Sequence, residues 1–242
     1  MRFDGRVAIV TGAGRGIGAA VASRLAAEGA LVHGCDLELP DPRPESFAGA
    51  SIVDVAKPVD CDRAVADVVA MHGRLDALVN CAGVGIMRKT EEHTWDEWRR
   101  VLAVNLDGTY SMCRAAIPHL LESGGSIVNM ASVAGHRGQP YNAAYCASKG
   151  GVISLTEAIA IEYQRRGVRA NCVAPGGVAT DFASTLDFGG ELDWDLMRAT
   201  VMRVTDLVEA DEIAGAIAYL LSDEARSITG QTLVIDKGLL KM

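Results

Sequence analysis

Residues 7–18 read VAIVTGAGRGIG and decide the fold of this chain. The first residues are apolar and mostly β-branched, which is typical of a buried strand. Four glycines follow within this stretch, and the segment Ile17–Glu28 then has the periodicity of an amphipathic helix. Glycines in such a strand-to-helix turn let the backbone approach a pyrophosphate at the amino terminus of the helix. The stretch therefore predicts a strand, a phosphate-binding turn and a helix.

The alternation of strand and helix continues along the chain. Buried strands are expected at Val7–Val10, Leu31–Cys35, Ser51–Val55, Ala77–Val79, Ser126–Asn129, Arg169–Val173 and Thr232–Ile235. Helices are expected at Ile17–Glu28, Asp62–Met71, Trp95–Val101, Gly108–Leu121, Ala143–Arg166 and Ala210–Leu221. This alternation predicts an α/β fold with a parallel sheet covered on both faces. Since no repeat or linker interrupts the 242 residues, we expect one domain spanning 1–242.

Composition excludes several classes of protein. The formal net charge is −8, and an acidic surface of this kind repels the phosphate backbone of a nucleic acid. Apolar runs such as Ile213–Leu221 are far shorter than the roughly 20 residues that a membrane-spanning helix needs. The residues Met1–Gly5 lead directly into a strand pattern without a signal sequence, so a cytoplasmic location is expected.

Cysteine and histidine usage argues against metal binding and disulfides. The six cysteines include no C-x-x-C pair, and the five histidines show no H-x-x-x-H spacing. Scattered cysteines in a reducing compartment are usually buried free thiols. We therefore expect neither a metal site nor a disulfide.

An acidic residue stands at the end of the second predicted strand. Asp36 lies about 20 residues beyond the glycine turn, the spacing at which a carboxylate bonds the ribose hydroxyls of an adenosine. A carboxylate there also repels the 2′-phosphate of NADP, and the following Leu37 carries no positive charge to pair with it. The sequence therefore favours NAD. Arg15 in the glycine turn could pair with a phosphate, so NADP is the less favoured alternative.

Tyr145 and Lys149 stand four residues apart in a predicted helix, so their side chains project from the same face. A phenol has a reference pKa of about 10, and a nearby ammonium and a positively charged nicotinamide would both lower it. Tyr145 is then a candidate general acid and base. Ser132, thirteen residues earlier, could donate a hydrogen bond to a carbonyl oxygen where charge develops. By itself the Y-x-x-x-K spacing is more often a solvated helical face, and the glycine turn is what favours catalysis.

These motifs together resemble those of the short-chain dehydrogenase/reductase family. The spacing of Gly12, Gly16 and Gly18 resembles the family's T-G-x-x-x-G-x-G fingerprint, residues 80–83 (NCAG) its N-N-A-G segment, and Tyr145 with Lys149 its Y-x-x-x-K pair. The resemblance covers nearly the whole chain and is to the single-domain form of roughly 250 residues. It implies a Rossmann-type, doubly wound parallel sheet of about seven strands with helices on both faces.

The resemblance also implies which residues form the site. The catalytic residues would be Asn105, Ser132, Tyr145 and Lys149, with Asn105 holding a water in a proton relay linked to the lysine. The residues expected to bind the cofactor are Gly12, Arg15, Gly16, Ile17, Gly18, Asp36, Asp54, Val55, Asn80, Ala82, Gly83, Tyr145, Lys149, Pro175, Gly176, Val178 and Thr180. In this set Asp54 and Val55 resemble the family's adenine-binding pair, and the last four residues resemble the segment that holds the nicotinamide carboxamide.

The implied activity is hydride transfer between NAD(H) and a secondary alcohol or ketone, with Tyr145 as the general acid and base. An NADPH-dependent 3-oxoacyl thioester reductase is the alternative within the family, and Asp36 argues against it. A dinucleotide-binding sensor without turnover is the alternative from another class, but a sensor has no need of all four catalytic residues. Relatives of this length usually pair the helices matching Gly108–Leu121 and Ala143–Arg166 across subunits, so a homotetramer is expected by resemblance.

Two stretches interrupt the regular pattern. Three prolines in Leu37–Ala50 disfavour a regular helix there. Gly176–Leu207 is long for a connection, which indicates a substrate loop or lid. Its apolar residues could close over a neutral organic substrate of modest size, and its acidic residues would disfavour anionic ligands. A solvated face or a subunit contact is an equally good interpretation of the same residues.

Three polar residues and two departures from the family pattern concern the surroundings of the site. Gln139, Asn142 and His136, between Ser132 and Tyr145, could contact polar groups of a substrate, but solvated loop side chains are the better expectation. Cys81 stands where the family has its second asparagine, which questions how that turn is held. Lys237 replaces a glycine in the C-terminal D-G-G and makes that turn less permissive.

Overall fold

The computed structural model describes residues 1–182, 186–200 and 206–241. Its main sheet has seven strands in the order β3-β2-β1-β4-β6-β7-β9, and every neighbouring pair is parallel. The strands are β1 Val7–Thr11, β2 Leu31–Asp36, β3 Gly49–Ile52, β4 Ala77–Asn80, β6 Ser126–Met130, β7 Arg169–Pro175 and β9 Thr232–Ile235. The strand order reverses between β1 and β4, and such a point in a doubly wound sheet is where ligands bind.

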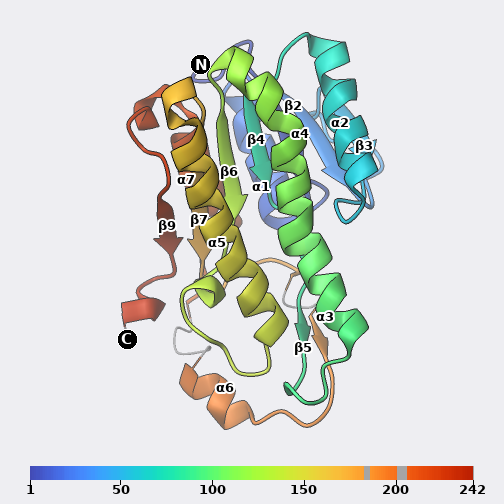
Figure 1. Cartoon of the computed structure of the whole chain (residues 1–242), viewed down its shortest axis with the longest axis vertical. Helices are drawn as coiled ribbons and strands as arrows, with labels where there is room; N and C mark the ends of the chain where they lie inside the picture. The colour runs from blue at the N-terminus through green and yellow to red at the C-terminus, as the bar shows by residue number, and fades with distance from the viewer. Residues whose placement is uncertain (183–185, 201–205, 242) are drawn as a thin grey trace.

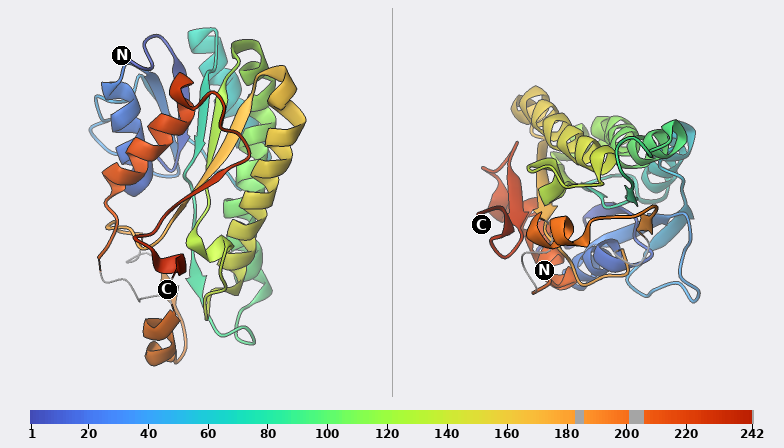
Figure 2. Two further views of the ribbon diagram at one scale, coloured as in Figure 1. Left: turned by 90° about the vertical axis from the view of Figure 1, so that its left-hand side faces the viewer. Right: turned by 90° about the horizontal axis from the view of Figure 1, so that it is seen from below.

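Helices cover both faces of this sheet (Figures 1 and 2). One face carries α1 (Gly16–Ala27) and α7 (Ala210–Leu221). The other face carries α2 (Pro58–His72), α4 (Gly108–Ser123) and α5 (Ala143–Tyr163). The expected Rossmann-type, doubly wound fold is confirmed.

Smaller elements gather at the carboxyl ends of the strands, at the lower end of Figure 1. A short parallel pair joins β5 (Ile86–Met87) to β8 (Asp187–Phe188), and α6 (Trp194–Thr200) follows it. Helix α3 (Trp95–Leu102) continues through a π-helical turn, Ala103–Asp107, into α4. Single 3₁₀ turns occur at Val133–Gly135, Gln164–Arg166, Asp223–Ala225 and Leu239–Lys241.

The core lies on both sides of the sheet because successive strand residues point to opposite faces. In β1, Ala8 and Val10 pack toward α1 and α7, whereas Val7 and Ile9 pack toward α2 and α4. All five residues of β1 are buried. Burial on both faces explains why the strands read as continuous apolar runs.

Most predicted boundaries hold to within one or two residues, with two informative exceptions. The expected strand Ser51–Val55 is wrong in its position, because β3 spans Gly49–Ile52. This edge strand pairs only with β2, and its ladder ends where Ile52 faces Asp36, the last residue of β2. Helix α2 begins at Pro58, earlier than expected, since proline is well accommodated in the first turn of a helix.

The two irregular stretches behave differently. Residues 37–48 contain no helix, as their prolines predict. The segment from Gly176 to Leu207 contains β8 and α6, and its residues 183–185 and 201–205 lie outside the described part of the chain.

All six cysteines are free thiols. Within the described ranges, no helix combines the length and the hydropathy needed to cross a bilayer.

Candidate active site

The glycine turn packs too tightly for side chains. Gly12 has a φ of +64°, and a Cβ on it would lie 2.8 Å from the backbone nitrogen of Ala82. A Cβ on Gly18 would lie 2.0 Å from the carbonyl oxygen of Gly12. The two glycines therefore let β1, the start of α1 and the segment after β4 come together.

Within the described residues, the N-cap side chain makes no hydrogen bond to the amino terminus of α1. Its N-cap residue, Arg15, makes no capping hydrogen bond, and the first turn contains no acidic residue. Gly16 and Ile17 open the helix, and Arg15 is exposed beside them. A helix start with free N–H groups attracts an anion, so this cradle fits the pyrophosphate of a dinucleotide.

Asp36 reaches back to the glycine turn from the end of β2. One carboxylate oxygen, Oδ2, accepts a hydrogen bond of 2.8 Å from the backbone nitrogen of Gly14. The other, Oδ1, accepts a longer one of 3.4 Å from Glu38. A Cβ on Gly14 would lie 3.0 Å from this carboxylate and 2.7 Å from the carbonyl oxygen of Glu38. Sequence reasoning missed Gly14, although its place in G-A-G was the available signal.

Three further residues of the expected cofactor-binding set, Asp54, Val55 and Asn80, differ in the contacts of their side chains. Asp54 accepts a hydrogen bond from the nitrogen of Ala56 and pairs with Lys57 at 3.4 Å. The Val55 side chain lies against Gly108. Asn80 is 3% exposed and donates to the Asn129 side chain at 2.8 Å. The side chain of Asn80 therefore belongs to a buried polar chain in the core.

The turn after β4 is held by residues far away in the sequence. The nitrogen of Ala82 donates to Thr11 Oγ1 at 3.2 Å. Asn105 Oδ1 accepts from the nitrogen of Val84 at 2.8 Å, and its Nδ2 donates to the Val84 carbonyl at 3.0 Å. Thr11 and Asn105 therefore hold this turn in place, although Cys81 replaces the second asparagine of the family's N-N-A-G segment.

Asn105 is fully buried in the π-helical turn between α3 and α4. Besides Val84, its Nδ2 also bonds Ser148 Oγ at 3.0 Å. A Cβ on Gly83 would lie 3.3 Å from Asn105 Oδ1 and 3.6 Å from Lys149 Nζ. The structure thus brings Asn105 and Lys149 to the same side of the turn, and π-helical turns of this kind are frequent at functional sites.

Lys149 and Tyr145 meet at the carboxyl end of the sheet. Lys149 is 3% exposed, and its Nζ donates to the carbonyl of Met130, the last residue of β6, at 2.7 Å. The same Nζ lies 5.6 Å from the centroid of the Tyr145 ring. The i, i+4 spacing in α5 therefore juxtaposes the two side chains as predicted.

Burial governs the pKa values of this pair. Desolvation raises the pKa of Tyr145 to about 12, and a hydrogen bond with Ser132 opposes that rise. Desolvation lowers the pKa of Lys149 to about 8. In the protein without a cofactor, the loss of solvent around the phenolate therefore outweighs the hydrogen bond with Ser132, and the expected lowering of this pKa by Lys149 and a bound nicotinamide stays a prediction.

Ser132 completes the cluster. It is buried, follows β6 by two residues, and is the N-cap of the turn Val133–Gly135, where its Oγ accepts from the nitrogen of Ala134 at 3.1 Å. Its hydrogen bond with Tyr145 joins the two hydroxyl groups. Ser132, Tyr145, Lys149 and Asn105 thus occupy one region at the carboxyl ends of β4 and β6.

The segment after β7 lies over the glycine turn. Thr180 approaches to 3.5 Å from the position of a Cβ on Gly16. Val178 forms a parallel bridge with Val208 and packs with Ile17 against the same core cluster. Pro175 ends β7, and Gly176 lies directly against Asp236. The four residues of this predicted group therefore lie in the segment that begins at the carboxyl end of β7, and Thr180 borders the glycine turn.

Residues of the segment 176–207, the predicted substrate loop, lie near Tyr145. The Phe182 ring lies 6.2 Å from the Tyr145 ring, and a Cβ on Gly85 would lie 2.5 Å from Leu186. Arg88, directly after β5, fastens this loop: its guanidinium donates to the Asp187 carboxylate at 2.8 Å and pairs with Glu97 at 2.9 Å. The loop is thus tied to the end of β5, and its apolar side chains lie beside Tyr145.

The polar residues between Ser132 and Tyr145 divide into two kinds. His136 is exposed and Gln139 half-buried, consistent with loop side chains. Asn142 is only 7% exposed, so the expectation that it is solvated is wrong. It lies at the start of α5 and its Nδ2 donates to Gln139 Oε1.

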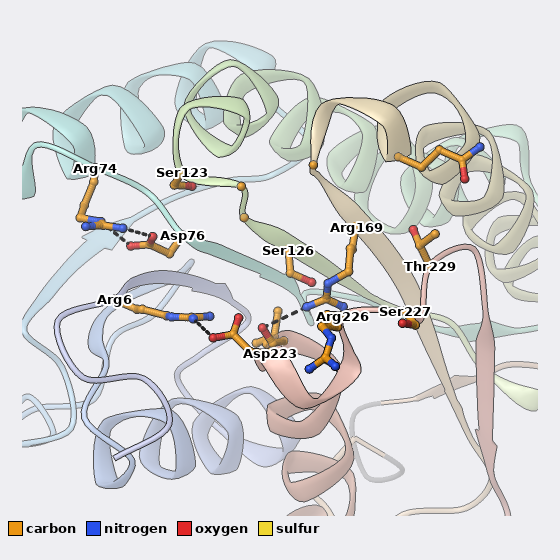
Figure 3. Close-up of a pocket in the computed structure, with 15 residues that line it drawn as sticks. Arg6, Arg74, Asp76, Ser123, Ser126, Arg169, Asp223, Arg226, Ser227 and Thr229 are labelled. Carbon is orange, nitrogen blue, oxygen red and sulfur yellow. Dashed lines mark hydrogen bonds and ion pairs between the residues drawn. The ribbon is translucent and has the colours of Figure 1, made fainter.

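A cavity of about 440 Å³ lies at the opposite end of the sheet (Figure 3). Four arginines line it, and three of them have partners: Arg6 pairs with Asp223, and Arg74 with Asp76. Arg169 donates to carbonyls at the end of α7. The cavity contains none of the predicted site residues, and these three arginines join strand starts to helix ends.

Comparison with known proteins gives consistent matches. The family model described as "Enoyl-(Acyl carrier protein) reductase" matches residues 12–240. A D-threitol dehydrogenase from Mycolicibacterium smegmatis is 40% identical, covering 98% of this chain and 94% of the relative. A meso-2,3-butanediol dehydrogenase from Serratia marcescens is 38% identical, covering 98% and 96%. Among solved structures, the 3-ketoacyl-(acyl-carrier-protein) reductase from Brucella melitensis complexed with NADH is similar at a TM-score of 0.87 and 33% identity, over 98% of this chain and 99% of that one.

Proposed function

The chain belongs to the short-chain dehydrogenase/reductase family, and we propose that it interconverts a secondary alcohol and a ketone with NAD(H). The observation that carries this proposal is the convergence of Ser132, Tyr145 and Lys149 beside the glycine turn. Relatives at 38–40% identity are named as dehydrogenases of threitol and butanediol, which are alcohols. The chain acts as one domain, and the segment 176–207 is its substrate loop.

The cofactor is proposed to lie across the carboxyl ends of β1 and β4. The free N–H groups of α1 bind the pyrophosphate, Asp36 the adenosine ribose, and the segment Pro175–Thr180 the nicotinamide carboxamide. When bound, a nicotinamide dinucleotide supplies the hydride donor or acceptor. Small residues at Ala82 and Gly83 allow the backbone to approach it closely.

NAD is proposed over NADP because of Asp36. Its carboxylate is held in place by Gly14, so it cannot turn away to admit a 2′-phosphate without losing a hydrogen bond. Arg15 is exposed at the start of α1 and is the group through which NADP would be accepted. A relative of similar fold was solved with NADH.

In the proposed reaction the protein moves one proton at Tyr145 Oη. In oxidation the phenolate removes the hydroxyl proton of the alcohol, and in reduction the phenol returns it. Ser132 donates a hydrogen bond to the substrate oxygen, on which charge develops. The positive charge of Lys149 stabilises the phenolate, and Asn105 holds the turn that faces Lys149.

A 3-oxoacyl thioester reductase is the second candidate. The similar structure from Brucella melitensis carries that name and was solved with NADH, so cofactor preference alone does not separate the two functions. Phe182, Phe188 and Leu186 suit a neutral substrate, and the acidic side chains of this loop oppose an anionic carrier. We therefore favour the alcohol dehydrogenase over the thioester reductase and over a sensor without turnover.

Self-association as a homotetramer is proposed through α4 and α5. Tyr110 on α4 is 52% exposed, and Ile161 on α5 is 71% exposed. Large apolar side chains on neighbouring outer helical faces favour burial against another copy. Light scattering coupled to gel filtration measures the mass, and a monomer would contradict this proposal.

The experiment that tests the function follows cofactor absorbance with purified protein. NAD and NADP are each tested against secondary alcohols, diols, sugars, hydroxysteroids and 3-hydroxyacyl thioesters, with Tyr145→Phe as the control. Turnover of an alcohol with NAD that disappears in Tyr145→Phe, while NADH binding is retained, supports the proposal. Preference for NADP and thioesters would favour the second candidate, and tight NADH binding without any turnover would favour a sensor.

A further inference from the structure

Ser148 precedes Lys149 in α5, and its side chain is fully buried. Its Oγ donates to the carbonyl oxygen of Tyr145 at 2.8 Å and accepts from Asn105 Nδ2 at 3.0 Å. A helical serine often donates back to a carbonyl of the preceding turn, and that bond alone indicates no function. The bond with Asn105 is different, because it leaves the helix and reaches a residue 43 positions away in the sequence.

The hydroxyl proton of Ser148 determines how the Asn105 amide is oriented. A hydroxyl has one proton, and the carbonyl of Tyr145 accepts it. Ser148 can therefore only accept from Asn105, so the amide nitrogen has to face it. Val84 favours the same orientation, because its nitrogen donates to Asn105 Oδ1 and its carbonyl accepts from Nδ2. Both protons of Nδ2 are thereby used, and the amide is held from two elements of the fold.

This orientation places the amide oxygen of Asn105 on the side of Lys149. A Cβ on Gly83 would lie 3.3 Å from Asn105 Oδ1 and 3.6 Å from Lys149 Nζ, so both atoms approach the same position in the turn. An amide oxygen near an ammonium is favourable, whereas the amide nitrogen would present its protons to the cation. Because Lys149 is buried, water screens this interaction little. Ser148 therefore supports the orientation that suits the charged lysine.

Ser148 also joins α5 to the turn after β4. Helix α5 carries Tyr145 and Lys149, and the turn borders the proposed position of the cofactor. Asn105 links the two, since it bonds this turn at Val84 and α5 at Ser148. A displacement of about 1 Å between reacting groups can slow a reaction about a hundredfold. A bond that keeps α5 and the turn in register therefore acts on the chemical step.

We propose that Ser148 is a positioning residue of this reaction, which holds Asn105 against α5 and so keeps the catalytic side chains of that helix in a fixed relation to the turn after β4. This inference rests on the proposed function, in which Tyr145 transfers the proton. Ser148 acts through Asn105 and not on the substrate. Loss of its hydroxyl leaves a buried N–H of Asn105 without an acceptor and removes this connection between α5 and the turn.

The test compares Ser148→Ala with Ser154→Ala. Both variants remove one serine hydroxyl from α5, but Ser154 is exposed and serves as the matched control. The kinetic constants kcat and KM are measured for the alcohol of the panel that the wild type oxidises fastest. The same alcohol with deuterium on its carbinol carbon gives the isotope effect on kcat. Fluorescence titration with NADH and thermal unfolding follow cofactor binding and folding.

In Ser148→Ala we expect kcat to fall about tenfold and its isotope effect to increase, while KM and the NADH dissociation constant stay within about twofold. Ser154→Ala should behave as the wild type. A kcat of Ser148→Ala within about twofold of the wild type, or a loss confined to KM or to the unfolding temperature, would overturn the proposal. The proposed function would survive that result, because the wild type still turns over an alcohol.

A double-mutant cycle tests whether Ser148 acts through Asn105. In Asn105→Ala the serine has no amide to hold, so adding Ser148→Ala should lower kcat by less than about twofold. A further tenfold loss in this background would overturn the role through Asn105. Should Asn105→Ala fail to fold, the split between kcat and KM in Ser148→Ala decides alone. Absence of turnover of any alcohol by the wild type would overturn the proposed function, and this inference with it.

Discussion

The carboxylate of Asp36 accepts a hydrogen bond from the backbone nitrogen of Gly14, and this 2.8 Å contact joins the end of β2 to the glycine turn. Asp36 therefore has two proposed roles, and a single substitution can remove one of them and keep the other. It holds the turn through an oxygen acceptor, and it presents a negative charge where an adenosine ribose is proposed to bind.

We predict that Asp36→Asn and Asp36→Ala differ in their effects. Asparagine keeps an oxygen for Gly14 but loses the charge, so the preference for NADH over NADPH should fall by about tenfold or more with NADH binding largely kept. Alanine loses both, so the binding of both cofactors should weaken. Fluorescence titrations with NADH and NADPH measure the dissociation constants. An unchanged ratio in Asp36→Asn would show that the charge does not select the cofactor.

We predict that Gly18→Ala abolishes NADH binding. Its Cβ would lie 2.0 Å from the carbonyl oxygen of Gly12, so the turn has to open. Overpacking of this kind costs about 1–3 kcal/mol or more of folding free energy. Gly138→Ala is the matched control, because no atom lies within 4 Å of the added carbon. Thermal unfolding and NADH titration are compared, and equal behaviour of the two variants would refute the close approach.

The sequence predicted the features that depend on local pattern. The glycine turn and the pair Tyr145 and Lys149 are each contained in a few neighbouring residues, so spacing alone indicates them. The contacts of Asn105 with Val84 and of Asp36 with Gly14 span 21 and 22 residues. Their existence depends on how β1, β2 and β4 align in the sheet, which no local pattern encodes.

Besides these long-range contacts, the burial of polar side chains could not be predicted from the sequence. The sequence pattern predicts that Asn142 is a solvated loop residue, yet it is buried at the start of α5, and the backbone nitrogens of Arg88 and Asp193 donate hydrogen bonds to its neighbour Tyr141. The raised pKa of Tyr145 in the protein without cofactor was not predicted for the same reason, since the desolvation of the phenol depends on the folded surroundings. Both cases concern how much water reaches a polar group.

We predict that Arg88 positions the substrate loop. Arg88→Ala removes the contacts with Asp187 and Glu97, so the loop should loosen and KM for the alcohol should rise by about tenfold, while NADH binding changes little. Arg88→Lys keeps the charge without the planar fork and should restore only part of the affinity. Arg99→Ala, whose residue is exposed on α3, is the control. A change in kcat alone would argue against a role in positioning.

Buried thiols should make the protein less stable at alkaline pH. Burial raises the pKa of Cys35 from 9.0 to about 12. Between these values the unfolded chain loses this proton and the folded chain keeps it, so the free energy of unfolding falls as the pH rises. Urea unfolding at pH 8 and pH 10 should show a loss that is about 1 kcal/mol smaller in Cys35→Ala than in the wild type. Equal losses in the two proteins would contradict the raised pKa.

The backbone of Lys237 in the C-terminal turn is strained, and a substitution by glycine should relieve that strain. Lys237 has a φ of 50°, a left-handed conformation that costs a residue other than glycine about 1 kcal/mol or more. Its ion pair with Asp206 at 3.2 Å joins two solvent-accessible side chains and contributes little. Lys237→Gly should therefore raise the unfolding temperature by about 2–4 °C. Lys237→Ala removes the same ion pair but retains the strain, so its unfolding temperature should not rise. If both variants lower the unfolding temperature equally, the left-handed conformation of Lys237 has no measurable cost, and the loss common to both variants is the contribution of the ion pair with Asp206.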